Sequence, residues 1–124
     1  MLATNAVILC VDDEEIPRML RKLILQKQGY EVVTVASAKE ALEMLAARHF
    51  DLVLTDQMMP GMAGTELTKH IKSTMPRMPV VIISGVNELP VDVSYADRFI
   101  SKIEGPVALF QGIAKVLEEY RLAV

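Results

Sequence analysis

Short apolar runs alternate with segments of helical spacing along the whole chain. Five runs rich in β-branched residues predict strands, at residues 6–11, 31–35, 51–55, 79–83 and 99–101. Four segments predict helices, over 16–28, from Ser37 onward, over 65–74 and over 106–122. The first, third and fourth strands are continuously apolar, which is typical of strands buried on both faces of a parallel sheet. The pattern therefore predicts an α/β fold in which helices flank a doubly wound, five-stranded parallel sheet.

Two of the predicted helices carry boundary signals. Gly29 follows the first helix, and glycine commonly ends helices because it tolerates a left-handed backbone. Ser37 is followed three residues later by Glu40, which is the pattern of a capping box. The first helix is predicted from residues that recur at helical spacing, namely Met19, Leu20, Leu23, Ile24 and Lys27.

The segment 87–96 lies where a further helix between the fourth and fifth strands belongs. It contains Pro90, followed by Val91 and Val93. An internal proline costs a helix about 3 kcal/mol because it removes a hydrogen bond and clashes with the preceding turn. We therefore expect this fourth helix to be short, distorted or replaced by a loop.

Polar residues follow four of the five predicted strands. Asp12 and Asp13 follow the first strand, Asp56 the third, Ser84 the fourth and Lys102 the fifth. Because ligands of open parallel sheets bind beyond the carboxyl ends of the strands, these side chains are expected to face one site. Three carboxylates close together repel one another unless a cation joins them. Mg²⁺ suits a site with a few carboxylates and an incoming phosphoryl oxygen.

The same set of side chains suits phosphoryl transfer. Asp56 is the candidate nucleophile, since a carboxylate can form a covalent acyl phosphate. Lys102 is expected to place a positive charge on one phosphoryl oxygen, and Ser84 to donate a hydrogen bond to another. Positioning and charge neutralisation supply most of the catalysis in such reactions.

Each of these residues alone has a simpler explanation. An aspartate pair after a strand is often a helix N-cap. Asp56 alone fits a turn, Ser84 before Gly85 fits another turn, and Lys102 fits ordinary surface charge. Their joint occurrence at the ends of the predicted strands is not easily explained by caps and turns, and it favours a shared site.

The residues at these strand ends resemble the receiver domain of two-component response regulators. The resemblance rests on Val-Asp-Asp at 11–13, Thr-Asp-Gln-Met-Met-Pro-Gly-Met-Ala-Gly at 55–64, Ile-Ser-Gly at 83–85, and Lys102. It extends over essentially the whole chain and implies a single receiver domain at 1–124 with a flavodoxin-like fold. It also implies a phosphorylation switch that requires Mg²⁺.

The resemblance implies a role for each matching residue. Asp56 corresponds to the phosphorylated aspartate and a metal ligand. Asp13 corresponds to the direct metal ligand, with Asp12 acting through water. The backbone carbonyl of Met58 occupies the position of a further ligand.

Two more positions correspond to the switch of the family. Ser84 matches the hydroxyl that moves toward the phosphoryl group. Phe99, three residues before Lys102, matches the aromatic residue that reports the switch. Phe99 is equally interpretable as a buried aromatic residue of the last strand, and the two interpretations are compatible.

The chain departs from the family pattern at several positions. Ile103 stands where the family has proline after its lysine, and a cis bond before a non-proline residue costs about 2.5–4 kcal/mol, so we expect a trans bond. The span from Ser84 to Lys102 is a few residues shorter than is usual in the family, and it contains Pro90. The family commonly signals through the surface that this span forms. Met58 and Val86 are apolar at positions that tune acyl-phosphate lifetime, which predicts slow autodephosphorylation.

Composition narrows the possible partners. The chain has 124 residues, of which 52% are hydrophobic, and a net charge of −3, which suits one domain and argues against a nucleic-acid surface. Cys10 is the single cysteine, so an intrachain disulfide is excluded. We expect neither a targeting segment nor a membrane span, and therefore a cytoplasmic protein. The chain is expected to be either a stand-alone receiver or part of a longer protein.

The predicted function is phosphoacceptance rather than enzymatic turnover. The resemblance implies a histidine kinase or histidine phosphotransfer protein as donor, and self-catalysed transfer. The family commonly dimerises through its fourth-helix face, which is atypical in this chain, so we expect a monomer or weak dimer. The alternative is a phosphorylation-independent module that binds partners through its surface. Enzymes of related topology fit less well. A haloacid-dehalogenase-type phosphatase needs an aspartate at Met58, and a flavodoxin phosphate loop or a Rossmann Gly-x-Gly motif is incompatible with Asp-Asp-Glu-Glu at 12–15.

Overall fold

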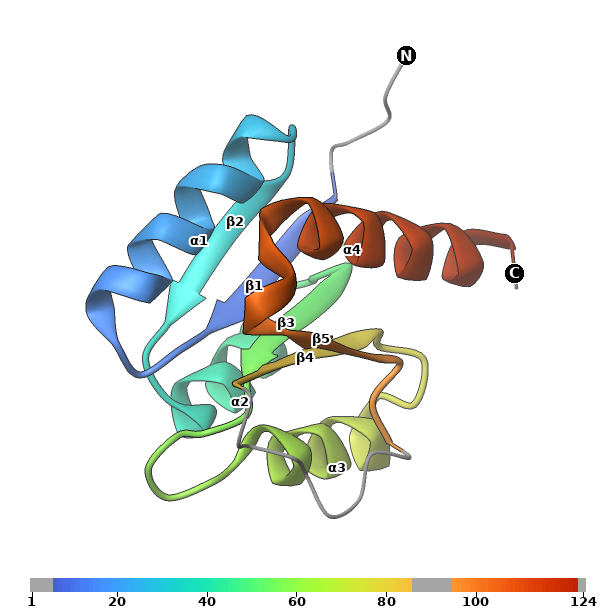
Figure 1. Cartoon of the computed structure of the whole chain (residues 1–124). Coiled ribbons are helices and arrows are strands. Elements are labelled where there is room, and N and C mark those ends of the chain that lie inside the picture. The colour runs from blue at the N-terminus through green and yellow to red at the C-terminus, as the bar shows by residue number, and fades with distance from the viewer. Residues whose placement is uncertain (1–5, 86–94, 123–124) are drawn as a thin grey trace.

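A five-stranded parallel sheet forms the centre of the molecule (Figure 1). The computed structural model describes residues 6–85 and 95–122. The strands run in the spatial order β2-β1-β3-β4-β5. Their bounds are β1 Val7–Val11, β2 Glu31–Val35, β3 Leu52–Asp56, β4 Val80–Ser84 and β5 Arg98–Ser101. All five strands were predicted from the sequence, and their ends differ from the prediction by one residue at most.

The helices cover both faces of the sheet, as predicted. Helices α1 and α4 lie on one face, and α2 and α3 lie on the other (Figure 1). Their bounds are α1 Glu15–Lys27, α2 Ala38–Ala47, α3 Gly64–Thr74 and α4 Gly105–Leu122, with a short 3₁₀ helix η1 at Lys102–Glu104. The short or distorted helix expected at 87–96 falls mainly on residues 86–94, outside the described residues. Within the described ranges, no helix combines the length and apolarity needed to cross a membrane.

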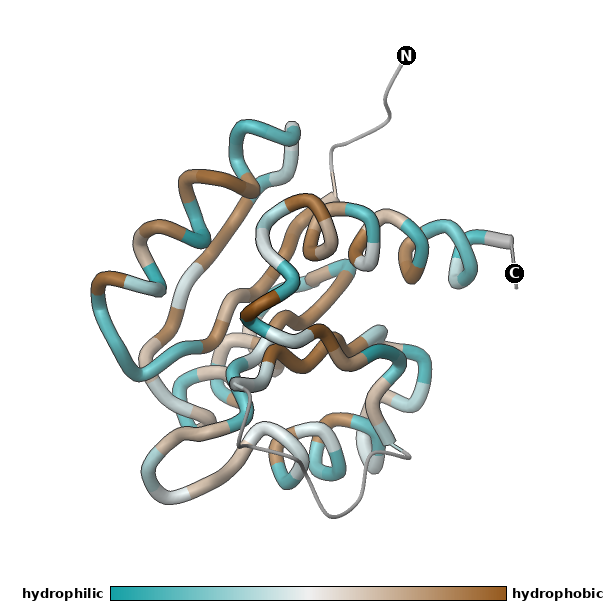
Figure 2. Tube along the Cα trace, in the orientation of Figure 1, coloured by the Kyte–Doolittle hydropathy of each residue, from teal (hydrophilic) through white to brown (hydrophobic). Residues whose placement is uncertain are grey.

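The hydrophobic core forms two clusters, one on each face of the sheet. Successive residues of a strand point to opposite faces, so Ile8 and Cys10 of β1 pack with α1 and α4, whereas Leu9 and Val11 pack with α2 and α3. Figure 2 shows the apolar character concentrated in the central strands. This burial explains why β1, β3 and β4 read as largely continuous apolar runs.

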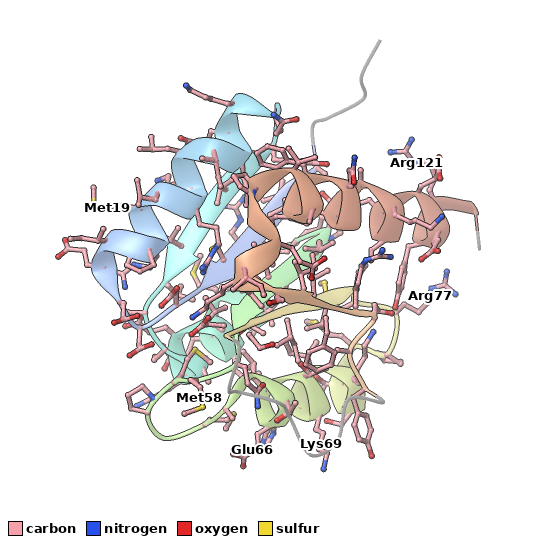
Figure 3. The ribbon with its side chains drawn as sticks, viewed as in Figure 1. Met19, Met58, Glu66, Lys69, Arg77 and Arg121 are labelled. Atoms are coloured by element: carbon pink, nitrogen blue, oxygen red, sulfur yellow. The ribbon has the colours of Figure 1, made fainter. Side chains whose placement is uncertain are left out.

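Helix α1 buries a different face from the one suggested by its apolar spacing. Met19, Leu20 and Leu23 are each more than half exposed. Figure 3 shows Met19 on the outer side of the helix, away from the sheet. Leu25 is fully buried, and the side chain of Arg21 is only 11% exposed. The spacing predicted the helix correctly, but an arginine occupies part of its inward face.

The predicted helix ends are largely confirmed. The Ser37 hydroxyl accepts a hydrogen bond from the Glu40 backbone N–H at 3.1 Å and caps α2. The Glu40 carboxylate accepts from the N–H of Ala36 at 2.8 Å, one residue before the position expected of a capping box. Gly29, which follows α1, has a φ of 98°, which agrees with the expected left-handed end.

A polar network joins α3 to α4 around Asp97. Asp97 Oδ2 accepts hydrogen bonds from the Val80 backbone N–H at 2.8 Å and from Lys72 Nζ at 2.9 Å. The Tyr120 hydroxyl donates to Asp97 Oδ1 at 2.6 Å and accepts from Lys72 Nζ at 3.0 Å. Because these groups come from α3, from α4, from the first residue of β4 and from the residue before β5, the network fixes elements that are distant in the sequence.

Candidate functional site

Three carboxylates meet at the carboxyl ends of β1 and β3. The two strands are neighbours, with Val11 in register with Thr55, so the residues that follow lie side by side. One carboxylate oxygen from each of Asp12, Asp13 and Asp56 lies within 4.8 Å of the others. Asp12 and Asp56 are buried, whereas Asp13 is exposed. The structure thus brings together the three acids that the strand pattern pointed to.

Lys102 forms an ion pair with Asp56. Its Nζ lies 2.9 Å from Asp56 Oδ1, and the side chain of Asp56 is 3% exposed against 36% for Lys102. Lys102 is held at this point because it begins η1, whose first turn is closed by a capping box between Ser101 and Glu104. The lysine therefore lies at the rim of the site and its charge points inward.

The electrostatic environment of Asp56 is set by opposing effects. Burial raises the pKa of its carboxyl, and the charge of Asp12 raises it further. The hydrogen bond and the charge of Lys102 lower the pKa, as does the charge of Arg21. The net direction is upward, so burial outweighs the two nearby cations, and these cations partly offset the cost of burying the charged form of Asp56.

Ser84 and Phe99 lie on the strands that complete this edge of the sheet. Ser84 ends β4 and is 8% exposed, and it immediately follows Ile83, the register partner of Asp56. Phe99 is in β5 and packs, partly buried, against the core cluster on the α2–α3 face. This packing agrees with the interpretation of Phe99 as a core aromatic residue, and its role in a switch stays a prediction.

The loop between β3 and α3 is closed by Gln57. Its backbone carbonyl accepts from the N–H of Gly64 at 2.9 Å, and its Oε1 accepts from the N–H of Thr65 at 3.0 Å. A Cβ atom at Gly64 would lie 2.5 Å from the backbone oxygen of Asp56, so the loop returns directly against the acceptor. Met58 extends from this loop with a side chain that is 59% exposed (Figure 3). The role assigned to the Met58 carbonyl stays a prediction.

The aspartate pair does not form the N-cap of α1. That position is Glu14, which makes no side-chain capping bond. Asp12 Oδ1 instead accepts from the Glu14 N–H at 2.9 Å, and so holds the turn between β1 and α1. The interpretation of these aspartates as simple helix caps is therefore wrong for this chain.

Arg21 reaches the site from α1, although the motifs did not identify it. Its Nη1 lies 2.8 Å from Asp12 Oδ2. Arg18 donates from the same helix to the backbone oxygen of Asp12 at 2.9 Å. The sequence did contain a signal that these arginines face the sheet. Arg18, Arg21 and the buried Leu25 recur at i, i+3 and i+7, so they share one face of the helix.

Two further predictions concern the site. The described residues contain no cis peptide bond, which confirms the trans bond expected between Lys102 and Ile103. The donor set of Asp12, Asp13 and Asp56 consists of carboxylate oxygens that lie close to one another, and it fits a hard divalent cation such as Mg²⁺. Asp13 is the exposed member, so the cluster is accessible to solvent at this residue.

Comparison with known proteins agrees with this geometry. The family model for the response regulator receiver domain matches residues 8–114. The chain belongs to this family. The acids, Ser84 and Lys102 of this receiver domain all lie within the matched range.

Curated relatives contain the receiver domain as part of longer proteins. The transcriptional regulatory protein GlrR of Escherichia coli K12 is 35% identical over 118 residues, which cover 92% of this chain and 27% of GlrR. The autoinducer 1 sensor kinase/phosphatase LuxN of Vibrio campbellii is 36% identical over 81 residues, which cover 65% of this chain and 10% of LuxN. The chain thus spans about a quarter or less of these two relatives.

Solved structures show the same fold. A receiver domain protein from Clostridium thermocellum matches with a TM-score of 0.89 at 28% identity, covering 96% of this chain and 99% of that one. The response regulator TrrA of Thermotoga maritima, solved in complex with Mg²⁺ and BeF, matches with a TM-score of 0.84 at 31% identity, covering 90% and 98%. The flavodoxin-like doubly wound fold expected from the sequence is therefore confirmed.

Proposed function

We propose that this receiver domain is a phosphoacceptor switch of a two-component phosphorelay, with Asp56 as the acceptor. The observation that carries the proposal is the buried Asp56 carboxylate, which is paired with Lys102 inside a cluster of three acids. An Asp56 oxygen attacks the phosphorus of a phosphohistidine. A new O–P bond forms, the N–P bond breaks, and the electron pair leaves with the imidazole, which takes up a proton.

The other residues of the site orient and neutralise the phosphoryl group. Lys102 stabilises one equatorial oxygen by its charge, and Ser84 donates a hydrogen bond to another. Asp12, Asp13, Asp56 and the Met58 carbonyl are the proposed holders of Mg²⁺. When bound, the ion neutralises charge on the phosphoryl oxygens. The protein is therefore substrate and partial catalyst, and not an enzyme with turnover.

The proposed donor is a protein, either a histidine kinase or a histidine phosphotransfer protein. Ile16 and Leu20 of α1 are 70% and 57% exposed, and Ile103 of η1 is 74% exposed. Helices α1 and α4 cover the same face of the sheet, and both begin at the edge that holds Asp56 (Figure 1). These exposed apolar side chains are the proposed contacts with the donor protein.

Phosphorylation is proposed to shift an existing equilibrium between two conformations, with Ser84 and Phe99 as the switch residues. The apolar side chain of Met58 cannot orient an attacking water, which supports slow autodephosphorylation. Val86, the other apolar residue expected to affect acyl-phosphate lifetime, lies outside the described residues. A cytoplasmic location, a monomer or weak dimer, and a single domain at 1–124 stay predictions.

The test is labelling by a small phosphodonor with and without Mg²⁺. The wild type is expected to form a phosphoprotein with Mg²⁺, and Asp56→Asn is expected to form none. Asp51→Asn is the matched control. Asp51 precedes β3 at its other end, where its Oδ2 accepts from the Val7 N–H at 2.7 Å. Labelling that persists in Asp56→Asn contradicts the assignment, and an unlabelled wild type favours the phosphorylation-independent module.

A further inference from the structure

Arg21 places a cation inside the acidic site, in addition to Lys102. Its guanidinium lies 2.8 Å from Asp12 Oδ2, with side chains that are 11% and 1% exposed. Both side chains of the Arg21–Asp12 pair are largely buried, whereas Lys102 in the Lys102–Asp56 pair is 36% exposed. Because buried charges are screened little by solvent, the charge of Arg21 acts on the whole cluster. Its charge lowers the pKa of Asp56.

The two cations change the charge balance of the cluster. Asp12, Asp13 and Asp56 supply three negative charges, and Lys102 and Arg21 supply two positive ones, so one negative charge remains. Without Arg21 two negative charges would remain. A divalent cation is attracted by this remainder and is repelled by each fixed positive charge. Arg21 therefore opposes cation binding while it holds Asp12, a proposed metal-holding residue, in position.

We propose that Arg21 is a fixed counter-cation of Asp12 that weakens the affinity of the acidic site for divalent cations. This inference rests on the proposed function, which assigns a Mg²⁺ site to the acids. Arg21 acts through Asp12 and is a positioning residue. Arg21 could act through its charge or by orienting Asp12, and an experiment can separate the two because they predict different changes in cation affinity. If its charge dominates, removing it strengthens cation binding. If it only orients Asp12, removing it weakens cation binding or leaves it unchanged.

The experiment is calorimetric titration of the protein with Mg²⁺ alone, at neutral pH and constant ionic strength. Arg21→Met removes the charge and keeps a long, flexible side chain that fills the same space. Arg21→Lys keeps the charge with fewer hydrogen-bond donors. Arg18→Met is the matched control, because Arg18 lies one turn earlier on α1 and donates to the Asp12 backbone oxygen instead of its carboxylate. Arg21→Gln replaces Arg21→Met if that variant does not fold.

The expected result is a Kd for Mg²⁺ that falls about tenfold or more in Arg21→Met, because the repulsion between a unit charge and a divalent ion about 6 Å away is already worth about tenfold in Kd at the dielectric constant of water. Arg21→Lys is expected to stay near the wild type, and Arg18→Met to change less than Arg21→Met. An unchanged or higher Kd in Arg21→Met overturns the inference. Absence of Mg²⁺ binding by the wild type overturns the proposed metal site itself, which is a different outcome.

Discussion

Gly64 is the residue at which the β3–α3 loop presses most closely on the phosphoacceptor. A Cβ atom there would lie 2.5 Å from the Asp56 backbone oxygen, and 3.1 Å from both Cα and Oε1 of Gln57. The first two contacts are to backbone, which cannot rotate away as a side chain can. We therefore predict that Gly64→Ala displaces the loop and destabilises the protein.

The magnitude follows from two opposing effects. Gly64 begins α3 and has no positive φ, so alanine would by itself favour the helix by up to about 1 kcal/mol. Overpacking against a close neighbour costs about 1–3 kcal/mol. The overpacking prevails, and the free energy of unfolding is expected to fall by about 1–2 kcal/mol. The shift falls on Asp56, so phosphorylation should also slow.

The assay is urea unfolding at equilibrium, and Gly112→Ala is the control. A Cβ at Gly112 would lie 2.7 Å from Cδ1 of Ile100 and 3.3 Å from side-chain atoms of Arg98. These are side-chain atoms, which can move aside more readily than backbone, so we expect a change within about 1 kcal/mol of the wild type. A Gly64→Ala protein as stable as the wild type would refute the reasoning, because it would show that the loop is not confined by the Asp56 backbone.

Three further predictions concern stability and reactivity. Burial raises the pKa of Asp56, so its ionisation lowers stability as pH rises above the ordinary carboxyl value of 3.8. Asp56→Asn should thus raise the free energy of unfolding on the order of 1 kcal/mol at pH 7. Urea unfolding at lower pH should show a smaller gain, because Asp56 itself becomes protonated there. A variant less stable than the wild type at pH 7 would contradict this. Tyr120→Phe removes a hydroxyl bonded to Asp97 and Lys72 and should cost about 1–2 kcal/mol in the same assay, whereas an unchanged midpoint would show the network to be dispensable. Burial raises the pKa of Cys10 to about 11, so a thiol reagent at pH 8 should modify it only after unfolding, and rapid labelling of the native protein would contradict the burial.

The strand ends were predictable because two independent patterns coincide there. Apolar runs place the strands, and charged or hydroxyl residues follow four of the five runs, at the end of the sheet where ligands of such folds bind. Asp12, Asp56 and Lys102 could thus be placed at one edge of the sheet before any coordinates. The pairing distance between Asp56 and Lys102 depends on the turn of η1, which the sequence pattern did not predict.

The inward face of α1 could not be predicted from apolar spacing. Leu20 and Leu23 suggest burial by their chemistry, yet they face outward, because the helix turns Arg21 toward Asp12 instead. A buried ion pair of this kind depends on a partner nine residues away in another element. Local periodicity carries no information about such a pairing, although the spacing of Arg18, Arg21 and Leu25 is compatible with it.

The central claim, that Asp56 carries the phosphoryl group, is tested most directly by trapping the acyl phosphate. The protein is treated with a small phosphodonor and Mg²⁺, reduced with borohydride and digested, and the modified residue is identified by mass spectrometry. The account predicts reductive conversion of Asp56 to homoserine, dependent on the phosphodonor and on Mg²⁺. Conversion at Asp12 or Asp13, or at no residue, would contradict it.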